Sequence, residues 1–182
     1  MEKGFVIWIT GLPASGKTTV ARIVADKLRS MGLKVEMLDG DEVRKWLSPE
    51  AGFTREDRER HLRRVAYVSK LLARNGVAVI ASFVSPYRKI RSEIRQIIEN
   101  ENIPFIEVYT KCSLQKCIRR DPKGLYKKAL AGEIKHFTGL DDPYEEPENP
   151  EVTLDTENTS PKENAEKLLN YIKENILTQS NK

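Results

Sequence analysis

The sequence predicts an α/β fold of three layers, in which about five parallel strands form a sheet with helices on both faces and a lid segment at one edge. Short apolar runs alternate with longer segments whose apolar residues recur at helical spacing, from the start of the chain to its end. The run at residues 77–81 is apolar throughout, which is typical of a strand buried on both faces. Right-handed crossovers between parallel strands would bring their carboxyl ends to one edge, where ligands bind.

The first half of the chain predicts three strands. In the first long helix, Val20, Ile23, Val24 and Leu28 share one face, and Gly32 follows as a C-terminal cap. The expected order is a strand at 5–10, a helix at 18–31, a strand at 34–38, a short helix that stops near Pro49, a long helix at 54–74 and a strand at 77–81.

The second half predicts two further strands and a lid. Ser160 and Glu163 form a capping box, with Pro161 at the first helical position, and so mark the start of the closing helix. The expected order is a helix at 86–100, a strand at 104–109, a short helix at 114–120, a polar segment at about 123–148 that we interpret as a lid, and a strand at 151–155. Closure of such a lid would exclude water from the site beneath it.

Residues 11–18, GLPASGKT, match the phosphate-loop pattern G-x-x-x-x-G-K-[ST] between the first strand and the first helix. Backbone N–H groups in such a loop surround an anion, and the helix adds the positive end of its dipole. Lys17 can neutralise the β- and γ-phosphates, and the Thr18 hydroxyl can bind Mg²⁺. The predicted fold is therefore similar to that of phosphate-loop NTPases.

Two acidic residues follow the second strand, at the predicted ligand edge. Asp39 and Asp41 can accept a proton from a nucleophile or hold Mg²⁺ through water. The third strand ends without an acid, so this pair has to supply the charge that phosphate-loop enzymes usually carry there. The structural alternative is an Asp-Gly turn that caps the next helix.

A second cluster is basic. Arg44, Arg58, Arg63 and Arg64 could form an anion site, although charged runs on helices are usually solvated faces. His61 lies three residues after Arg58 and shares its helical face, where it could be a structural histidine as readily as a substrate contact.

Composition narrows the class of protein. A chain of 182 residues fits one domain, and its net charge of +4 suits phosphorylated substrates as well as polyanions. We expect no nucleic-acid partner, because no basic stripe with interleaved aromatic residues is present. No apolar run approaches the ~20 residues of a membrane span, so we expect a cytoplasmic protein without a membrane partner. Cys112 and Cys117 fit neither a redox pair nor a zinc site, and we expect ordinary thiols.

The whole chain resembles the adenylylsulfate kinase family. The matching stretches, in order, are residues 11–18, 38–41 with Arg44, 52–53 with 57–58, 82–86, 120–129, 132–135, 137–139 and 142–145. The resemblance implies that Mg·ATP phosphorylates the ribose 3′-hydroxyl of adenosine 5′-phosphosulfate (adenylylsulfate) to give 3′-phosphoadenosine 5′-phosphosulfate and ADP, in sulfate assimilation. It also implies a stand-alone kinase that forms a homodimer.

The resemblance assigns roles to individual residues. Asp39 and Asp41 would lie by the metal and the 3′-hydroxyl, Arg44 and Arg58 would hold the phosphosulfate, and Phe53 and Phe137 would stack on the substrate adenine. Lys123 and Lys127 would belong to the lid, and Lys17, Asp39, Asp41 and Ser85 would form the catalytic set, with Thr18 and Asp39 at the metal. The expected nucleotide-binding set is Gly11, Leu12, Pro13, Ala14, Ser15, Gly16, Lys17, Thr18, Thr19 and Arg120, and the expected acceptor-binding set is Asp41, Arg44, Phe53, Arg58, His61, Val84, Ser85, Lys123, Lys127 and Phe137.

Two positions need separate interpretation. Ser85 matches a serine described in the family as a phosphoenzyme intermediate, but no base is adjacent to it in sequence, so we expect Ser85 or the Val84 backbone to bind substrate instead. His61 replaces an asparagine that contacts substrate in the family. Because imidazole titrates near neutrality, we expect affinity for adenylylsulfate to vary between roughly pH 5.5 and 7.5.

Two other functions fit parts of the pattern. Another small-molecule kinase, acting on a sugar acid, nucleoside or antibiotic, would share the phosphate loop and the lid but would not require Phe53 and Phe137. A non-catalytic nucleotide-binding regulator would not require Lys17, Asp39 and Asp41 together.

Overall fold

The computed structural model describes residues 4–178. Its five strands lie in one sheet. All pairings are parallel and the strand order is β2-β3-β1-β4-β5, which confirms the fold predicted from sequence. The strands are β1 (Val6–Thr10), β2 (Val35–Asp39), β3 (Ala78–Ser82), β4 (Phe105–Lys111) and β5 (Val152–Asp155).

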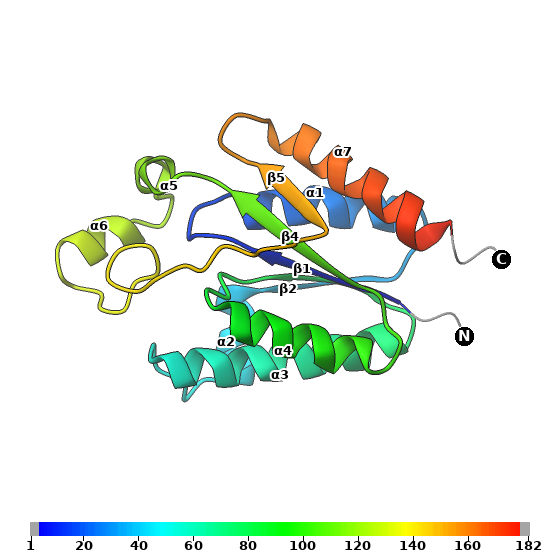
Figure 1. The fold of residues 1–182 in the computed structure, drawn as a ribbon, viewed down its shortest axis with the longest axis horizontal. Helices are drawn as coiled ribbons and strands as arrows, with labels where there is room; N and C mark the ends of the chain where they lie inside the picture. The colour runs from blue at the N-terminus through cyan, green and yellow to red at the C-terminus, as the bar shows by residue number, and fades with distance from the viewer. Residues whose placement is uncertain (1–3, 179–182) are drawn as a thin grey trace.

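Helices cover both faces of the sheet (Figure 1). One face packs against α1 (Lys17–Ser30) and α7 (Pro161–Ile172), and the other against α3 (Arg55–Arg74) and α4 (Arg88–Glu99). The remaining helical segments are α2 (Gly40–Leu47), α5 (Leu114–Arg120), α6 (Leu125–Leu130) and a π-helical turn after α7 (Lys173–Leu177). None of the helices in residues 4–178 is long and apolar enough to cross a bilayer.

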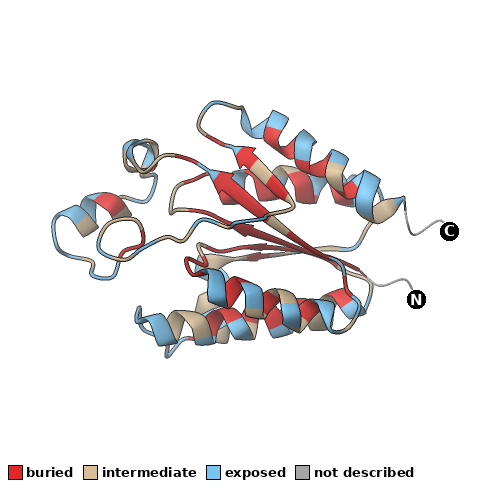
Figure 2. Cartoon of the chain, in the orientation of Figure 1, coloured by how far each residue is buried: buried red, intermediate tan, exposed pale blue. Residues whose placement is uncertain are grey.

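The side chains of β1 point alternately into two separate hydrophobic cores. Ile7 and Ile9 pack toward α1 and α7, whereas Val6 and Trp8 pack toward α3 and α4, and all four side chains are fully buried. Because successive side chains of a strand point to opposite faces, a strand at the centre of such a sheet has to be apolar throughout. Figure 2 shows the result, with buried residues concentrated in the strands and on the inward sides of the helices.

The lid contains a helix that the sequence analysis did not predict. Helix α6 begins after Gly124, whose φ of 66° lies in the left-handed region, and the Asp121 carboxylate accepts hydrogen bonds from the backbone N–H groups of Tyr126 and Lys127. Only Tyr126 is buried on this helix of six residues, which is too short to show periodicity. The remaining predicted elements are present, with ends within three residues of the expected positions for the strands and for the helices at 18–31, 54–74, 86–100 and 114–120.

The first and last described residues, 4 and 178, lie on the side of the sheet away from the lid (Figure 1). Strand β1 starts there, and α7 runs back from the carboxyl edge toward the same side. The carboxyl edge, where parallel sheets bind ligands, lies on the opposite side, toward the lid.

Candidate active site

The phosphate loop joins β1 to α1 at the carboxyl edge of the sheet. Gly11 lies so close to β4 that an added Cβ would stand 2.1 Å from Thr110 Oγ1, so no larger residue fits. Gly16 has a φ of 89° and directly precedes α1, which carries no acidic residue in its first turn. Glycines thus permit the loop's path, and the positive helix end remains available to an anion.

Lys17 lies folded across the loop. Its Nζ donates hydrogen bonds to the carbonyl oxygens of Gly11 (3.0 Å) and Leu12 (2.7 Å), and its side chain is buried. Burial lowers its pKa to about 8, opposed in part by the carboxylate of Asp39. A phosphate in the loop would give this ammonium group a charged partner in place of two carbonyls.

Hydroxyl groups fix the base of the loop to the neighbouring strands. Ser15 Oγ lies 2.7 Å from Thr110 Oγ1, which in turn donates to the Thr10 carbonyl at 3.1 Å. Thr10 Oγ1 donates to the Val84 carbonyl at 2.7 Å and so connects β1 to the loop after β3. The phosphate loop and the Val84 loop are therefore held in a fixed relation to each other.

Asp39 and Asp41 lie at the same edge, as predicted. Asp39 ends β2 and pairs in register with Ser82, the last residue of β3, which carries no acid in its place. Asp41 lies in the first turn of α2 and forms an ion pair with Lys123 of the lid. The two carboxylates thus differ in setting: Asp39 lies near Lys17, and Asp41 reaches across to the lid.

A cavity of about 1280 Å³ connects these groups. Sites for one drug-sized ligand usually occupy about 300–1,000 Å³, so this volume fits two substrates side by side. Of the residues predicted from sequence, those that line it are Pro13, Ala14, Gly16, Lys17, Thr18, Thr19, Asp39, Asp41, Arg44, Phe53, Arg58, His61, Val84, Ser85, Arg120, Lys123 and Phe137.

Four residues of the expected nucleotide- and acceptor-binding sets lie outside the cavity wall, as do Arg63 and Arg64, which form ion pairs with Glu93 and Glu50. Ser15 is buried beneath the loop, and Gly11 and Leu12 present their carbonyl oxygens to Lys17. Lys127 is exposed on α6, and its backbone N–H bonds Asp121. Its role in binding substrate stays a prediction.

One side of the cavity carries two guanidinium groups. Arg44 stacks over the Phe53 ring, 4.9 Å from its centroid, and donates to the backbone carbonyls of Ala51 and Gly52. Burial, and next the positive charge of Arg58, lower the pKa of Arg44. Two cations this close favour a multiply charged anion between them.

Arg58 also fastens the lid. It donates to Thr138 Oγ1 (2.8 Å), to the His136 carbonyl and to the Asp142 carboxylate (3.1 Å), and Tyr87 donates to the same carboxylate at 2.8 Å. The predicted anion ligand is thus engaged with lid residues. An incoming anion would share or replace these partners.

His61 is buried in the wall of the cavity, with 3% of its surface exposed. Burial, followed by the charges of Arg44 and Arg64, lowers its pKa to about 4. The pH window of 5.5–7.5 predicted from sequence is therefore wrong, because the imidazole stays neutral throughout that range. The sequence could not show the burial or the two neighbouring cations.

The loop after β3 holds Ser85 in a buried corner. Ser85 Oγ accepts a hydrogen bond from Trp8 Nε1 at 3.0 Å and donates to the Phe83 carbonyl at 3.2 Å, while Arg91 donates to the Ser85 carbonyl at 2.6 Å. The hydroxyl contacts neither carboxylate nor imidazole among the described side chains. A nucleophilic serine needs such a base, so the geometry favours a positioning role.

The lid shares a small apolar cluster with α5 and the phosphate loop, and this cluster contains Cys112 and Cys117 as buried free thiols. Tyr126 and Phe137 meet edge to face with ring centroids 4.9 Å apart, and the Tyr126 hydroxyl donates to the Pro13 carbonyl at 2.9 Å. The lid therefore docks directly on the phosphate loop.

The sequence analysis missed one wall of the cavity. Arg120 donates to the Thr156 carbonyl, and residues 156–161 together with Asn164 line the cavity beside the phosphate loop. An available signal was overlooked: this segment follows β5 at the same carboxyl edge as every other predicted ligand loop.

Comparison with known proteins agrees with this geometry. The sequence model of the adenylylsulphate kinase family matches residues 3–155. A probable adenylyl-sulfate kinase of Aeropyrum pernix is 58% identical over 173 residues, which are 95% of this chain and 94% of that protein. An APS kinase of Mycobacterium tuberculosis, solved with AMPPNP and APS, has a TM-score of 0.92 at 42% identity and covers 95% of this chain and 99% of its own.

One related structure bears on assembly. The hexameric APS kinase of Thiobacillus denitrificans has a TM-score of 0.72 at 30% identity over 95% of this chain, which spans 29% of that protein.

Three findings lead to the same conclusion: a family model that matches most of the chain, high sequence identity over nearly the full length, and a closely similar solved structure. The chain belongs to the adenylylsulfate kinase family.

Proposed function

We propose that the chain is an ATP-dependent kinase that transfers the γ-phosphoryl group of ATP to the 3′-hydroxyl of adenylylsulfate, giving 3′-phosphoadenosine 5′-phosphosulfate and ADP. The observation that carries the proposal is one continuous cavity of about 1280 Å³, which has the phosphate loop at one side and two guanidinium groups with an aromatic ring at the other. Family membership supports the same assignment.

The nucleotide half of the cavity is built to bind phosphates. The loop's N–H groups and the start of α1 would surround the β- and γ-phosphates, and Lys17 would neutralise their charge. Arg120 and the segment 156–161 border this half and would contact the rest of ATP. The lid, docked on Pro13 through Tyr126, would exclude water from the transferred group.

The acceptor half would bind adenylylsulfate. Arg44 and Arg58 would hold the phosphosulfate, and Phe53 and Phe137 would stack on the adenine. His61, Val84 and Lys123 complete the wall around this half. Asp41 would accept the proton of the 3′-hydroxyl, because it is a carboxylate at the border between the two halves.

The donor groups fit Mg²⁺ bound mainly through ATP. The Thr18 hydroxyl and the Asp39 carboxylate line the cavity, and within residues 4–178 no cluster of three acidic, histidine or cysteine ligands forms a dedicated metal cage. Mg²⁺ typically takes one or two protein oxygens together with substrate phosphates and water. When bound, the ion would neutralise charge on the phosphates while Thr18 and Asp39 keep it in place.

We infer direct in-line transfer between the two bound substrates. Ser85 has both its hydrogen-bonding roles filled by Trp8 and Phe83, and it would position the Val84 backbone at the acceptor rather than carry the phosphoryl group. We further propose that the enzyme is a cytoplasmic homodimer in sulfate assimilation, as its family resemblance implies.

The first test is ADP release from Mg·ATP with and without adenylylsulfate, with the product identified by mass. We expect adenylylsulfate-dependent ADP and one equivalent of 3′-phosphoadenosine 5′-phosphosulfate. Release that ignores adenylylsulfate but responds to a sugar acid or nucleoside would assign a different acceptor. No turnover with any acceptor would support a nucleotide-binding regulator.

The Asp41→Asn variant tests the proposed base. We expect kcat to fall about a hundred-fold to ten-thousand-fold, with little change in melting temperature, because its ion pair with Lys123 is exposed. Glu42→Gln is the matched control, since Glu42 is the adjacent exposed acid on the same helix. Equal kcat values for the two variants would remove Asp41 from the mechanism.

A further inference from the structure

The side chain of His61 has one satisfied nitrogen and one unsatisfied nitrogen. Nδ1 lies 2.9 Å from Ser48 Oγ, while Nε2 is buried and has no hydrogen-bond partner in the protein. The residue lines the acceptor half of the cavity, and its ring meets the edge of Phe83 with centroids 5.7 Å apart. Buried polar atoms in folded proteins almost always have partners, so an orphan at a cavity wall points to a ligand atom.

The Ser48 hydroxyl decides which imidazole nitrogen carries the proton. Ser48 is 1% exposed, so water does not supply a partner. Its other polar neighbour is the Arg64 guanidinium, 3.2 Å away, which can only donate. The Ser48 proton therefore has His61 Nδ1 as its acceptor, and the neutral imidazole holds its own proton on Nε2.

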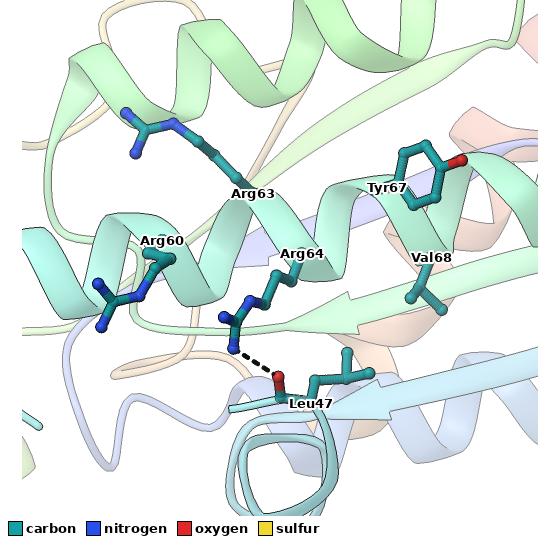
Figure 3. A pocket seen from close by; sticks show the side chains of 6 residues that line it. All are labelled: Leu47, Arg60, Arg63, Arg64, Tyr67 and Val68. Atoms are coloured by element: carbon teal, nitrogen blue, oxygen red, sulfur yellow. Dashed lines mark hydrogen bonds between the residues drawn. The ribbon is translucent and has the colours of Figure 1, made fainter. Parts of the chain in front are cut away.

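Arg64 holds Ser48 in this orientation. Arg64 extends from α3 to the end of α2, where Nη1 donates to the Leu47 carbonyl at 2.8 Å (Figure 3). The same nitrogen lies 2.6 Å from Glu50 Oε1, an ion pair that also holds the guanidinium in place. Arg64 thus ties the segment that carries Ser48 to the helix that carries His61.

The surroundings keep the imidazole neutral. Arg44 and Arg64 bring positive charge to the ring, Phe83 packs against it in a T-shaped contact, and the Glu50 carboxylate opposes the two cations. Together with burial they hold the His61 pKa near 4, so the ring enters binding as a neutral group with a single N–H. At Nε2, a neutral imidazole offers either a donor or an acceptor, depending on its tautomer. An asparagine amide in the same place offers both.

We propose that Ser48, held by Arg64, is a positioning residue that fixes His61 as the Nε2–H tautomer, so that Nε2 donates a hydrogen bond to an acceptor atom of the bound nucleotide substrate. The identity of that substrate rests on the proposed function; the tautomer does not. Ser48 and Arg64 thereby act on specificity without touching the substrate.

The tautomer is tested by ¹⁵N NMR of histidine-labelled protein, in which His136 is the second histidine and an internal reference. We expect a protonated Nε2 and an unprotonated Nδ1 for His61 at pH 7, and a shift of the Nε2–H resonance on adding adenylylsulfate with ADP. The Ser48→Ala variant should populate the other tautomer as well. Ser69→Ala is the control, because Ser69 is buried on α3, the helix that carries His61, and its hydroxyl donates to the Val65 carbonyl. A wild-type protein with the proton on Nδ1 would overturn the proposal.

Kinetics test the consequence for binding. We expect Ser48→Ala and His61→Leu to raise KM for adenylylsulfate about tenfold, the loss of one hydrogen bond, with kcat and the KM for ATP within about twofold. In the Ser48→Ala background, His61→Asn should restore much of the affinity, because an amide needs no tautomer. Unchanged KM values in both single variants would refute the role. A wild-type enzyme without adenylylsulfate-dependent turnover would instead refute the proposed substrate. The NMR experiment would then decide the tautomer on its own.

Discussion

At the scale of single residues, the titrating groups of the site behave unlike their free counterparts. Lys17 and His61 are both buried, and burial lowers the pKa of each, to about 8 and about 4. The same cause has opposite consequences at neutral pH: Lys17 keeps most of its charge, whereas His61 has none. Lys17 is therefore suited to bind phosphate as a cation, and His61 is suited to form hydrogen bonds as a neutral group in the same cavity.

The Lys17 pKa predicts how ATP binding depends on pH. Phosphates favour the protonated amine, so ATP should raise its pKa, and affinity should be constant below pH 8 and fall by up to about tenfold per pH unit above it. Calorimetric titration of a non-hydrolysable ATP analogue between pH 7 and 9.5 measures this, together with proton uptake that appears only above pH 8. A flat profile without proton uptake would contradict the assigned pKa.

Residue positions at the site were predictable where they follow a local pattern. The phosphate loop and the acids after β2 are read from consecutive residues, and they lie where expected. Contacts of Arg58 with Thr138 and Asp142, 80 and 84 residues away, have no local signature. Neither does the pairing of His61 with Ser48, which is why the predicted pH window failed.

At the scale of elements, strands were predicted better than the lid. Strands buried on both faces appear as short apolar runs between turn residues, and all five were recognised. Helix α6 buries a single side chain and is capped by Asp121 from outside the helix, so periodicity could not reveal it. The segment after β5 carries polar residues whose importance depends on the strand order.

The contact between lid and phosphate loop makes a prediction at this scale. Tyr126→Phe removes the hydrogen bond to the Pro13 carbonyl, worth about 1 kcal/mol. We expect a lid that opens more often and therefore a higher rate of ATP hydrolysis without acceptor. The measurement is ADP release in the absence of adenylylsulfate, compared with Tyr67→Phe, which alters an exposed tyrosine on α3. An unchanged rate would mean that this bond does not control closure.

At the scale of the whole molecule, β1 joins the two cores to the active site. Trp8 is fully buried in the core on the α3 side, stacks on Phe83 with centroids 5.5 Å apart, and donates to Ser85. One side chain thus links packing at the centre of the sheet to the loop that lines the acceptor half. Stability and substrate binding should consequently be coupled at this position.

A pair of tryptophan variants tests that coupling. Trp8→Phe removes a buried hydrogen bond and packing volume, and we expect a loss of about 1–3 kcal/mol in the free energy of unfolding and a raised KM for adenylylsulfate. Trp46→Phe is the control, since Trp46 is 81% exposed. Urea unfolding followed by fluorescence, with steady-state kinetics on the same samples, gives both quantities. A destabilised Trp8→Phe enzyme with an unaltered KM for adenylylsulfate would show that the packing of Trp8 is not coupled to substrate binding.

The place where the described chain begins and ends has a practical consequence. Residue 4, just before β1, and residue 178, just after the π-helical turn, lie by the amino ends of the strands, on the side of the sheet opposite the lid (Figure 1). A tether, an affinity tag or a fused fluorescent reporter joined before residue 4 or after residue 178 therefore meets the described fold on the side away from the cavity mouth. The protein can be immobilised through one terminus and labelled through the other while substrates enter and leave without obstruction.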